Sequence, residues 1–239
     1  IANRLRADNP WWTGALDPGT PPFNWPRRAY FLALQALLAT PVRRAVIVLG
    51  ARRVGKTTML RQLIGERAAS GHYGPILYAS VDTPTYAGLR LEKLIELFTR
   101  VYPHDAAAPR LIVFDEIQYV LDWERHLKDL VDRFPATRFV ASGSAGAALR
   151  RKSQESGAGR FTDFELPPLT FAEFLDFVGQ TEVVIDRSQP VAAARDIDAL
   201  NRLFVDYVNF GGFPEIVLSA PLRQDLARFV RSDIIDKVL

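Results

Sequence analysis

The segment Ala45–Thr58, with the sequence AVIVLGARRVGKTT, is the part of the chain that decides the fold. Its first five residues are apolar and predict a buried strand that ends at Gly50. Residues 50–57 then read G-x-x-x-x-G-K-T, the pattern of a phosphate-binding loop. A helical pattern of apolar residues follows. Strand, loop and helix in this order predict an α/β protein that binds phosphate where the helix begins.

Each part of the loop has a physical role in holding phosphate. Gly50 and Gly55 permit backbone angles and a close approach that a Cβ atom would prevent. Successive backbone N–H groups can then surround one anion, and the start of the helix adds positive partial charge. We expect Lys56 to contact the β- and γ-phosphates and the Thr57 hydroxyl to bind Mg²⁺. The predicted nucleotide-binding residues of the loop are Gly50, Ala51, Arg52, Arg53, Val54, Gly55, Lys56, Thr57 and Thr58.

The composition is that of an ordinary globular protein. The chain has 239 residues, 48% of them hydrophobic and 24% charged, so it can bury a large core. Its formal net charge of +3 permits a nucleic-acid partner without indicating one. The absence of cysteine excludes disulfides, thiol catalysis and Cys-ligated zinc. No apolar run approaches the roughly 18–20 residues of a membrane helix, so we expect a cytoplasmic protein without a membrane partner.

Strand and helix patterns alternate along the middle of the chain. Ranges typical of strands are 45–49, 76–81, 111–114, 138–141 and 161–166. Ranges typical of helices are 27–39, 57–70, 89–101, 122–134 and 170–178. Thr170 and Glu173 form a capping box at the start of the last helix. This alternation predicts a three-layer core at residues 27–178, with a parallel sheet covered by helices on both faces.

The two ends of the chain differ from this core. Residues 1–26 lack periodicity and are predicted to be an irregular arm. Its large aromatic side chains either pack on the core, line the adenine pocket or meet a partner; they are Trp11, Trp12, Phe23 and Trp25. Residues 179–239 are predicted to be a small helical lid, loosely patterned at 179–195 and broken at Gly211–Pro214. Because the chain begins with Ile and stops within a helical pattern, we expect it to be a fragment.

The strand at 111–114 delivers two carboxylates at its end, Asp115 and Glu116. Ligands of open parallel sheets bind at the carboxyl ends of strands, where Thr57 also emerges. We therefore expect Asp115 to hold Mg²⁺, directly or through water, and Glu116 to orient and polarise the attacking water. The alternative interpretation is a pair of surface acids at a strand terminus.

Two further features complete the predicted catalytic group. The strand at 138–141 is followed by Ser142 and Ser144, either of which would contact the γ-phosphate or the water; a plain turn is the alternative. Phosphoryl transfer also favours an arginine that neutralises charge in the transition state. Arg160, after a polar loop, is the first candidate, acting on a neighbouring subunit if the chain forms a homo-oligomer. It is one of 25 arginines, so an ordinary solvated residue is an equal alternative.

Five stretches together resemble the AAA-type P-loop ATPases of bacteria and archaea. They are GARRVGKTT (50–58), LIVFDEIQYVLDWERHLKDLVD (111–132), FVASGSAGAAL (139–149), GAGRFTDFELPPLTFAEF (157–174) and YVNFGGFPEIV (207–217). In that family an ATPase domain is often followed by a domain of poorly assigned function. The resemblance implies the strand order 5-1-4-3-2, a small helical lid, and ATP or ADP with Mg²⁺ as cofactors. The stretch ESGAG before Arg160 departs from the family, which has a bulky apolar residue there.

The C-terminal stretch also resembles the signalling (STAND-like) branch of these ATPases. In that branch a G-x-P turn in the lid presents its proline to adenine. Gly212–Phe213–Pro214 matches the turn, so the resemblance implies that Pro214 contacts the nucleotide. A simple helix-breaking turn is the alternative interpretation.

The sequence thus predicts an ATP-binding and Mg²⁺-dependent ATP-hydrolysing switch or motor domain, in which ATP sets the angle between core and lid. A nucleotide-sensing module with little turnover, regulating a DNA-binding or effector partner, is the alternative. The presence of Glu116 beside Asp115 argues against it. A small-molecule kinase is disfavoured because residues 179–239 show no conspicuous basic lid, and a DNA-remodelling or defence ATPase rests only on arginine content.

Overall fold

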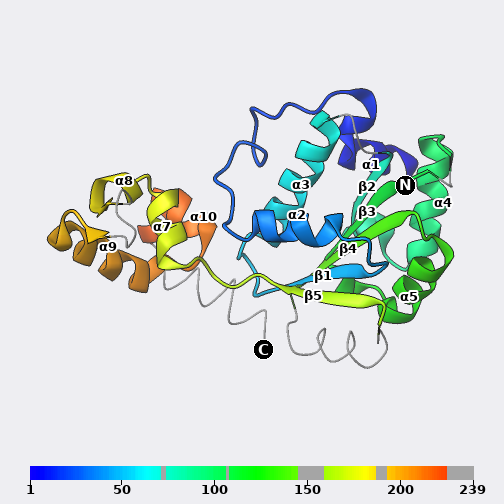
Figure 1. The fold of residues 1–239 in the computed structure, drawn as a ribbon. Coiled ribbons are helices and arrows are strands. Elements are labelled where there is room, and N and C mark those ends of the chain that lie inside the picture. The colour runs from blue at the N-terminus through cyan, green and yellow to red at the C-terminus, as the bar shows by residue number, and fades with distance from the viewer. Residues whose placement is uncertain (71–73, 106–107, 145–158, 187–192, 225–239) are drawn as a thin grey trace. The chain divides into compact units, whose positions relative to one another are not determined.

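The structure is a computed structural model that describes residues 1–70, 74–105, 108–144, 159–186 and 193–224, in two compact units (Figure 1). The first unit comprises Ile1–Trp25, Tyr30–Gly50 and Lys56–Glu165, and the second comprises Pro26–Ala29, Ala51–Gly55 and Leu166–Leu239. The tip of the predicted phosphate loop therefore groups with the C-terminal helices. The helical segment 170–178, which the sequence assigned to the core, groups with them too.

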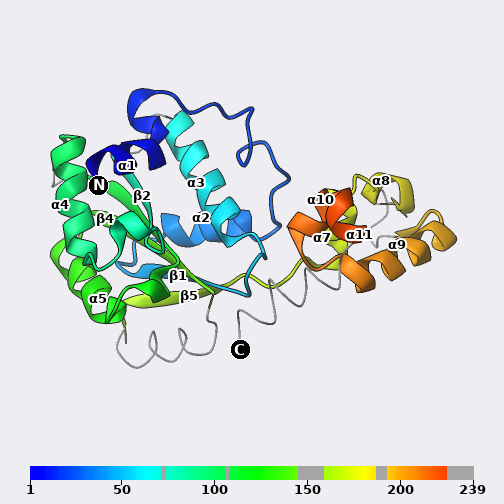
Figure 2. The same ribbon diagram turned by 180° about the vertical axis from the view of Figure 1, so that it is seen from behind.

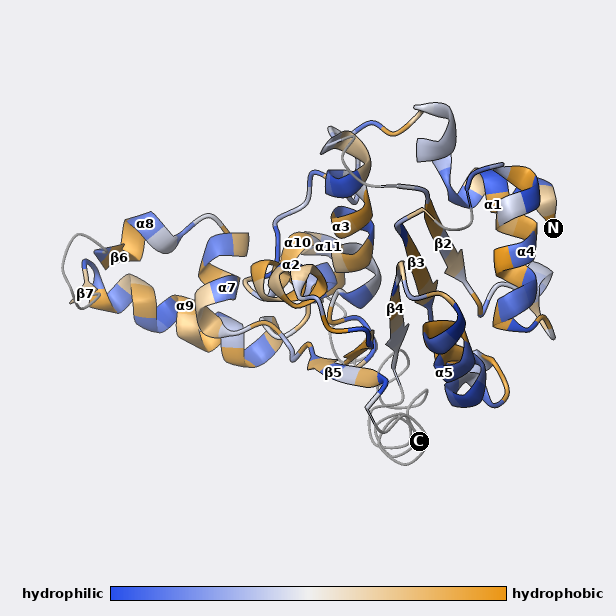
Figure 3. Ribbon diagram, turned by 45° about the vertical axis from the view of Figure 1, so that its right-hand side comes forward, coloured by the Kyte–Doolittle hydropathy of each residue, from blue (hydrophilic) through white to orange (hydrophobic). Residues whose placement is uncertain are grey.

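A five-stranded parallel sheet forms the centre of the first unit. Its strands are β1 (Ala45–Leu49), β2 (Ile76–Ser80), β3 (Arg110–Asp115), β4 (Thr137–Gly143) and β5 (Phe161–Glu165). Their order is β2-β3-β4-β1-β5, and each neighbouring pair is parallel. This confirms the predicted parallel sheet and the strand order that the resemblance implied. Figure 3 shows β2 and β3 as largely hydrophobic, as expected for strands covered on both faces.

Helices cover both faces of this sheet. Helices α2 (Phe31–Ala39) and α3 (Lys56–Ser70) lie over one face, and α1 (Ala2–Asp8), α4 (Leu91–Val101) and α5 (Trp123–Arg133) lie over the other (Figures 1 and 3). Helices α4 and α5 bury their apolar sides in the main core, where Phe98 and Trp123 are almost fully enclosed. The predicted helices are confirmed, with first residues that differ by at most four positions. Short 3-10 turns lie at Pro84–Tyr86 and Ile117–Tyr119.

The N-terminal arm is a correction to the sequence prediction. Residues 1–26, predicted to be irregular, contain helix α1 and the 3-10 helix Pro10–Thr13. Asn9, between these two helices, is fully buried, and its side-chain amide pairs with the backbone of Tyr78. Asn9 Oδ1 accepts from the Tyr78 N–H at 2.7 Å, and Asn9 Nδ2 donates to the Tyr78 carbonyl at 2.9 Å. Helix α1 was missed because its position depends on these distant contacts rather than on a periodic pattern.

Two tryptophans extend this contact along β2. The indole N–H groups of Trp11 and Trp12 both donate to the Ile76 carbonyl, at 3.0 and 2.7 Å. Trp12 also stacks on Phe98 of α4, with ring centroids 5.2 Å apart. Strand β2 is at the edge of the sheet, so the arm satisfies backbone groups that have no neighbouring strand on that side. Of the alternatives left open for Trp11 and Trp12, packing on the core is the one observed.

We expect an Asn9→Ala substitution to lower the free energy of unfolding by about 3 kcal/mol, because it leaves the buried N–H and carbonyl of Tyr78 without partners. Urea unfolding followed by circular dichroism would measure the change. Asn3→Ala, on the exposed side of α1, is the matched control and should change stability by less than about 0.5 kcal/mol. Equal effects of the two substitutions would contradict the prediction.

The second unit is a small helical cluster with its own core. Its elements are α7 (Phe171–Phe177), α8 (Thr181–Val184), β6 (Ile185–Asp186), β7 (Ala193–Ala194), α9 (Ile197–Phe210), α10 (Pro214–Leu218) and α11 (Ala220–Gln224). Figure 2 shows α10 beside α7, and Val217 of α10 shares a buried core with Phe174 and Leu175 of α7. The predicted break at Gly211–Pro214 is where α9 ends and α10 begins, and the predicted capping box of Thr170 and Glu173 is confirmed. No helix in the described ranges has the length and apolar character needed to cross a membrane.

Candidate functional site

The carboxyl ends of β1, β3 and β4 lie side by side at one end of the sheet in the first unit. Gly50 follows β1, Asp115 is the last residue of β3, and Ser142 lies near the end of β4. Helix α3 begins at Lys56, whose side chain turns back so that Nζ donates to the Gly50 carbonyl at 3.0 Å. Lys56 is only 4% exposed, which places a buried positive charge at this edge.

Asp115 is the centre of a buried hydrogen-bond cluster. Asp115 is 1% exposed, and its Oδ2 atom accepts hydrogen bonds from the hydroxyls of Thr57 and Tyr78, both at 2.8 Å. Its Oδ1 atom accepts from the Ser142 hydroxyl. The structure therefore brings together Thr57 and Asp115, the two residues expected to bind metal.

These oxygen atoms fit a magnesium ion. Mg²⁺ prefers hard oxygen ligands, and proteins bind it through one or two carboxylates together with phosphates and water. The described contacts of the buried Asp115 carboxylate are three hydroxyl donors and no cationic side chain. A buried carboxylate without a cation is unfavourable, so a divalent ion shared with the Thr57 hydroxyl would compensate its charge.

Tyr78 belongs to this cluster but was not identified from the sequence. Burial, followed by the negative charge of Asp115, raises the pKa of the Tyr78 phenol well above its ordinary value, so the hydroxyl remains a donor at neutral pH. The Arg61 guanidinium lies over the Tyr78 ring, 4.8 Å from its centroid. The only signal in the sequence was a phenol within an apolar strand, which is equally typical of a core residue.

Glu116 has an unusual backbone conformation for a residue with a side chain. Its φ is 58°, in the left-handed region, which costs a residue with a Cβ atom about 1–2 kcal/mol. Its N–H donates to the Ser142 hydroxyl at 3.2 Å, and its Oε2 atom accepts from Ser144 at 3.0 Å and from Gln118. Strain retained by surrounding contacts is common at functional sites.

The two serines thus occupy different positions. Ser142 contacts Asp115 and the Glu116 backbone, whereas Ser144 and Gln118 hold the Glu116 carboxylate. Which serine approaches a γ-phosphate stays a prediction. Gln118 is a further residue that the sequence reasoning missed, although it stands within the DEIQ stretch that carried the resemblance.

The loop tip Ala51–Gly55 belongs to the second unit and has its own contacts there. Arg53 and Gly55 have positive φ angles of 63° and 94°, and Arg53 forms an ion pair with Glu215 of α10. A Cβ atom on Gly55 would lie 3.6 Å from Cγ of Pro214, so this proline packs directly on the loop. Pro214 is therefore next to the predicted phosphate-binding loop, and its contact with adenine stays a prediction.

A buried ion pair also reaches the loop tip. Arg28 and Glu173 are 4% and 3% exposed, and Arg28 Nε donates to Glu173 Oε1 at 2.7 Å. Arg28 Nη1 donates to the Val54 carbonyl at 2.6 Å. Burial alone would raise the pKa of the Glu173 carboxyl, but hydrogen bonds from Arg28 and from the backbone of Thr170 and Ala29 outweigh it and hold the pKa below its ordinary value.

This lowered pKa predicts how stability depends on pH. A carboxylate whose pKa is depressed by folding stabilises the protein above its unfolded-state pKa and loses that contribution as pH falls through the folded-state pKa. We expect Glu173→Gln to cost about 3 kcal/mol at pH 7, and the difference from the unaltered protein to shrink below pH 4.5. Urea unfolding at several pH values would measure both quantities.

The control for this prediction is Glu182→Gln, on the exposed side of α8. It should change stability by less than about 0.5 kcal/mol at every pH. A Glu173→Gln difference that stayed constant or grew as the pH fell would contradict the assignment of a depressed pKa to Glu173.

Arg160 lies at the amino ends of the strands, opposite the end of the sheet that holds Asp115. It precedes β5, its carbonyl accepts from the Ala45 N–H at 2.8 Å where β1 begins, and its side chain pairs with Asp132 of α5. Parallel strands place their amino ends opposite their carboxyl ends, so the structure does not bring Arg160 to Thr57. Action on a neighbouring subunit stays a prediction, and the preceding residues 153–158 lie outside the described ranges.

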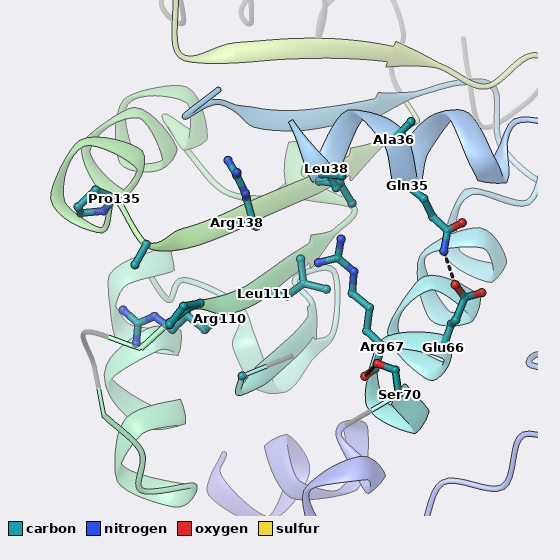
Figure 4. A pocket seen from close by; sticks show the side chains of 14 residues that line it. Gln35, Ala36, Leu38, Glu66, Arg67, Ser70, Arg110, Leu111, Pro135 and Arg138 are labelled. Atoms are coloured by element: carbon teal, nitrogen blue, oxygen red, sulfur yellow. Dashed lines mark hydrogen bonds between the residues drawn. The ribbon is translucent and has the colours of Figure 1, made fainter. Parts of the chain in front are cut away.

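A separate cavity of about 670 Å³ also lies at the amino ends of β3 and β4 (Figure 4). Three arginines line it, namely Arg67, Arg110 and Arg138. Arg138 donates to the carbonyls of Thr40 and Val42, at 2.6 and 2.8 Å, and so holds the connection between α2 and β1. This cavity is distinct from the cluster around Asp115, which lies at the carboxyl ends of the strands.

Comparison with known proteins gives a family and several relatives. A family model described as an AAA domain matches residues 42–175. The uncharacterized protein MJ1544 of Methanocaldococcus jannaschii is 29% identical over 172 residues, which are 72% of this chain and 36% of that protein. An uncharacterized protein of Haemophilus influenzae is 24% identical over 195 residues, 79% of this chain and 44% of that protein. The chain thus spans less than half the length of these curated relatives.

Solved structures show the same fold at low sequence identity. The Hsp104–ADP complex of S. cerevisiae has a TM-score of 0.56 at 13% identity, covering 97% of this chain and 35% of that one. The ORC1 protein of Aeropyrum pernix, solved in complex with DNA, has a TM-score of 0.52 at 15% identity, covering 88% of this chain and 63% of that one. Both support an AAA-like P-loop fold. The likeness to signalling ATPases stays a prediction.

Proposed function

The chain belongs to the AAA domain family, and from this premise we propose that it binds ATP with Mg²⁺ and hydrolyses the nucleotide, acting as an ATP-dependent switch. The observation that carries the proposal is the arrangement around Asp115. A buried carboxylate shares hydrogen bonds with the Thr57 hydroxyl, and a second carboxylate, Glu116, is held beside it by Ser144 and Gln118. Two carboxylates in such different surroundings are suited to different roles.

The proposed roles follow from these surroundings. Asp115 and the Thr57 hydroxyl hold Mg²⁺, which when bound neutralises negative charge on the β- and γ-phosphates. Lys56 leaves the Gly50 carbonyl and contacts the same phosphates. Its burial strengthens this contact, because little water remains to screen the charge.

Glu116 acts on the attacking water. The water oxygen bonds to the γ-phosphorus while the bond from that phosphorus to the bridging oxygen breaks, and the products are ADP and inorganic phosphate. Glu116 orients the water and receives its proton. Ser144 and Gln118 keep the Glu116 carboxylate in place. The left-handed backbone of Glu116 bends the chain away from the direction of β3 at this residue.

Isothermal titration with ATP and ADP, together with phosphate release, tests this function. We expect one nucleotide bound per chain and phosphate release that requires Mg²⁺ and stops on addition of EDTA. The assay is run with and without DNA, because the ORC1 structure of the same fold contains DNA. Failure to bind either nucleotide would overturn the proposal.

A nucleotide-sensing module with little turnover is the second candidate. One observation favours it: Arg160 lies at the amino ends of the strands, whereas Asp115 lies at their carboxyl ends. The arginine considered for transition-state charge is then available only if a neighbouring chain supplies it. Tight nucleotide binding with phosphate release no faster than that of Glu116→Gln, at every protein concentration, would favour the sensing module over the ATPase.

A further inference from the structure

The Val54 carbonyl, in the tip of the phosphate loop, is held by a charged side chain. Arg28 Nη1 donates to it at 2.6 Å, a short charge-assisted hydrogen bond. Val54 is fully buried and Arg28 is 4% exposed, so water does not compete for the contact. These residues all belong to the second unit.

Arg28 is itself fixed by a second charged residue. Its Nε and Nη2 atoms donate to the two carboxylate oxygens of Glu173, at 2.7 and 3.1 Å, in a forked arrangement. Nη2 also donates to the Pro167 carbonyl at 2.9 Å. Glu173 in turn accepts from the backbone N–H groups of Ala29 and Thr170, at 2.9 and 3.0 Å. A planar guanidinium with this many fixed partners has one orientation.

The geometry of the peptide bond carries this constraint into the phosphate site. The Val54 carbonyl and the Gly55 N–H belong to one planar trans peptide, in which C=O and N–H point in opposite directions. Because the carbonyl faces Arg28, the Gly55 N–H faces away from Arg28. Gly55 is the second glycine of the loop and has a φ of 94°, so its amide is one of the donors expected to meet phosphate.

We propose that Arg28 and Glu173 are positioning residues for nucleotide binding, which fix the Val54–Gly55 peptide so that the Gly55 N–H is presented to phosphate. The inference rests on the proposed function, because it assigns a role within the same phosphate-binding loop. The capping box alone does not account for the contact, because Thr170 and Glu173 would cap α7 without Arg28 or Val54. The pair joins three distant segments: residues 26–29, the loop tip and the start of α7.

The sequence allows this peptide to be observed selectively by NMR. The dipeptide Val-Gly occurs twice, as Val54–Gly55 and Val178–Gly179. In protein labelled with ¹³C at the valine carbonyl and ¹⁵N in glycine, a carbonyl-selected spectrum shows these two amides alone. The Val54 carbonyl shift reports the hydrogen bond from Arg28, and the Gly55 amide reports phosphate. Gly179, which follows α7, is the internal reference.

Arg28→Lys is the principal variant, because it keeps the charge and removes the fork. We expect the Val54 carbonyl resonance to shift in the free protein while the Gly179 signal stays in place. We also expect the affinity for Mg·ADP and for inorganic pyrophosphate to fall at least about tenfold, since a hydrogen bond to a charged group is lost from the loop. An unchanged Val54 resonance together with unaltered affinities in Arg28→Lys would overturn the inference.

Two more variants separate positioning from stability. Thr170→Val removes the capping hydroxyl and its 3.2 Å hydrogen bond to Glu173 Oε2, but it keeps the Thr170 N–H and both hydrogen bonds of the fork. It should therefore lower the melting temperature without changing nucleotide affinity. If Arg28→Lys does not fold, Glu173→Gln decides the question, because it retains Arg28 and breaks the fork, although its NH2 group also faces the backbone N–H of Ala29 or Thr170. Lower affinity in Glu173→Gln at a temperature where circular dichroism shows it folded supports the inference, and affinity equal to that of Thr170→Val overturns it.

The two proposals fail in different ways. If the unaltered protein binds neither Mg·ADP nor pyrophosphate, the proposed function is overturned and this inference with it. If the unaltered protein binds both and the Arg28 and Glu173 variants bind equally well, only the inference is overturned.

Discussion

A Lys56→Ala protein should bind ATP and ADP at least about 100-fold more weakly than the unaltered chain, and its phosphate release should fall to background. The reason is the position of the ammonium group. Lys56 is 4% exposed, lies at the first residue of α3, and is 3.0 Å from the Gly50 carbonyl. Arg52 and Arg53 are the other cations of this loop, but neither is as buried as Lys56, so we do not expect them to replace its charge.

Lys93→Ala provides the control for this experiment. Lys93 is an exposed lysine of α4 that pairs with Glu96 at 2.7 Å, and its removal should leave nucleotide affinity unchanged. Melting curves of both variants would show whether either substitution unfolds the protein. Full nucleotide affinity in Lys56→Ala would contradict the phosphate-binding role of residues 50–57 and the function built on it.

The second large effect concerns Glu116. We expect Glu116→Gln to reduce the rate of phosphate release by about 100- to 1,000-fold while nucleotide affinity stays within about threefold, because the substitution removes the acid–base group without removing a phosphate contact. Its amide can still form hydrogen bonds with Ser144 and Gln118, so the local geometry is retained. Single-turnover and steady-state rates, measured beside equilibrium binding, would separate the two quantities.

Glu96→Gln is the matched control for Glu116→Gln. Glu96 is an exposed carboxylate of α4, distant in sequence from every site residue, and its substitution should leave the rate unaltered. An unchanged rate in Glu116→Gln would remove the catalytic role of that carboxylate. Nucleotide binding without turnover in the unaltered protein would then favour the sensing module.

The parts of the molecule that could be predicted from the sequence are those specified by neighbouring residues. The run Ala45–Leu49 is apolar throughout and is followed by the spaced glycines of the loop, so the strand and the turn after it were both evident. The proximity of Thr57 and Asp115 followed from a general property of parallel sheets, namely that strand ends share one edge. Thr170 and Glu173 are three residues apart, and their capping box needs no tertiary information.

The parts that could not be predicted depend on residues far apart in the chain. Arg28 and Glu173 are separated by 145 residues, and no pattern in one sequence selects this arginine from the 25 present. Asn9 meets Tyr78 across 69 residues for the same reason. The left-handed backbone of Glu116 was also unpredicted, because glutamate has no preference for that region and surrounding contacts retain it there.

The hydrogen bonds that Asn9, Trp11 and Trp12 make to the backbone of β2 have a consequence for how the protein behaves in solution. A chain shortened to begin at Arg27 would uncover the backbone of Ile76 and Tyr78 along an edge strand that is otherwise apolar. Such an open edge accepts a strand from another molecule and so starts aggregation. We therefore expect residues 9–12 to protect the folded chain against self-association through its sheet, independently of any part they have in nucleotide chemistry.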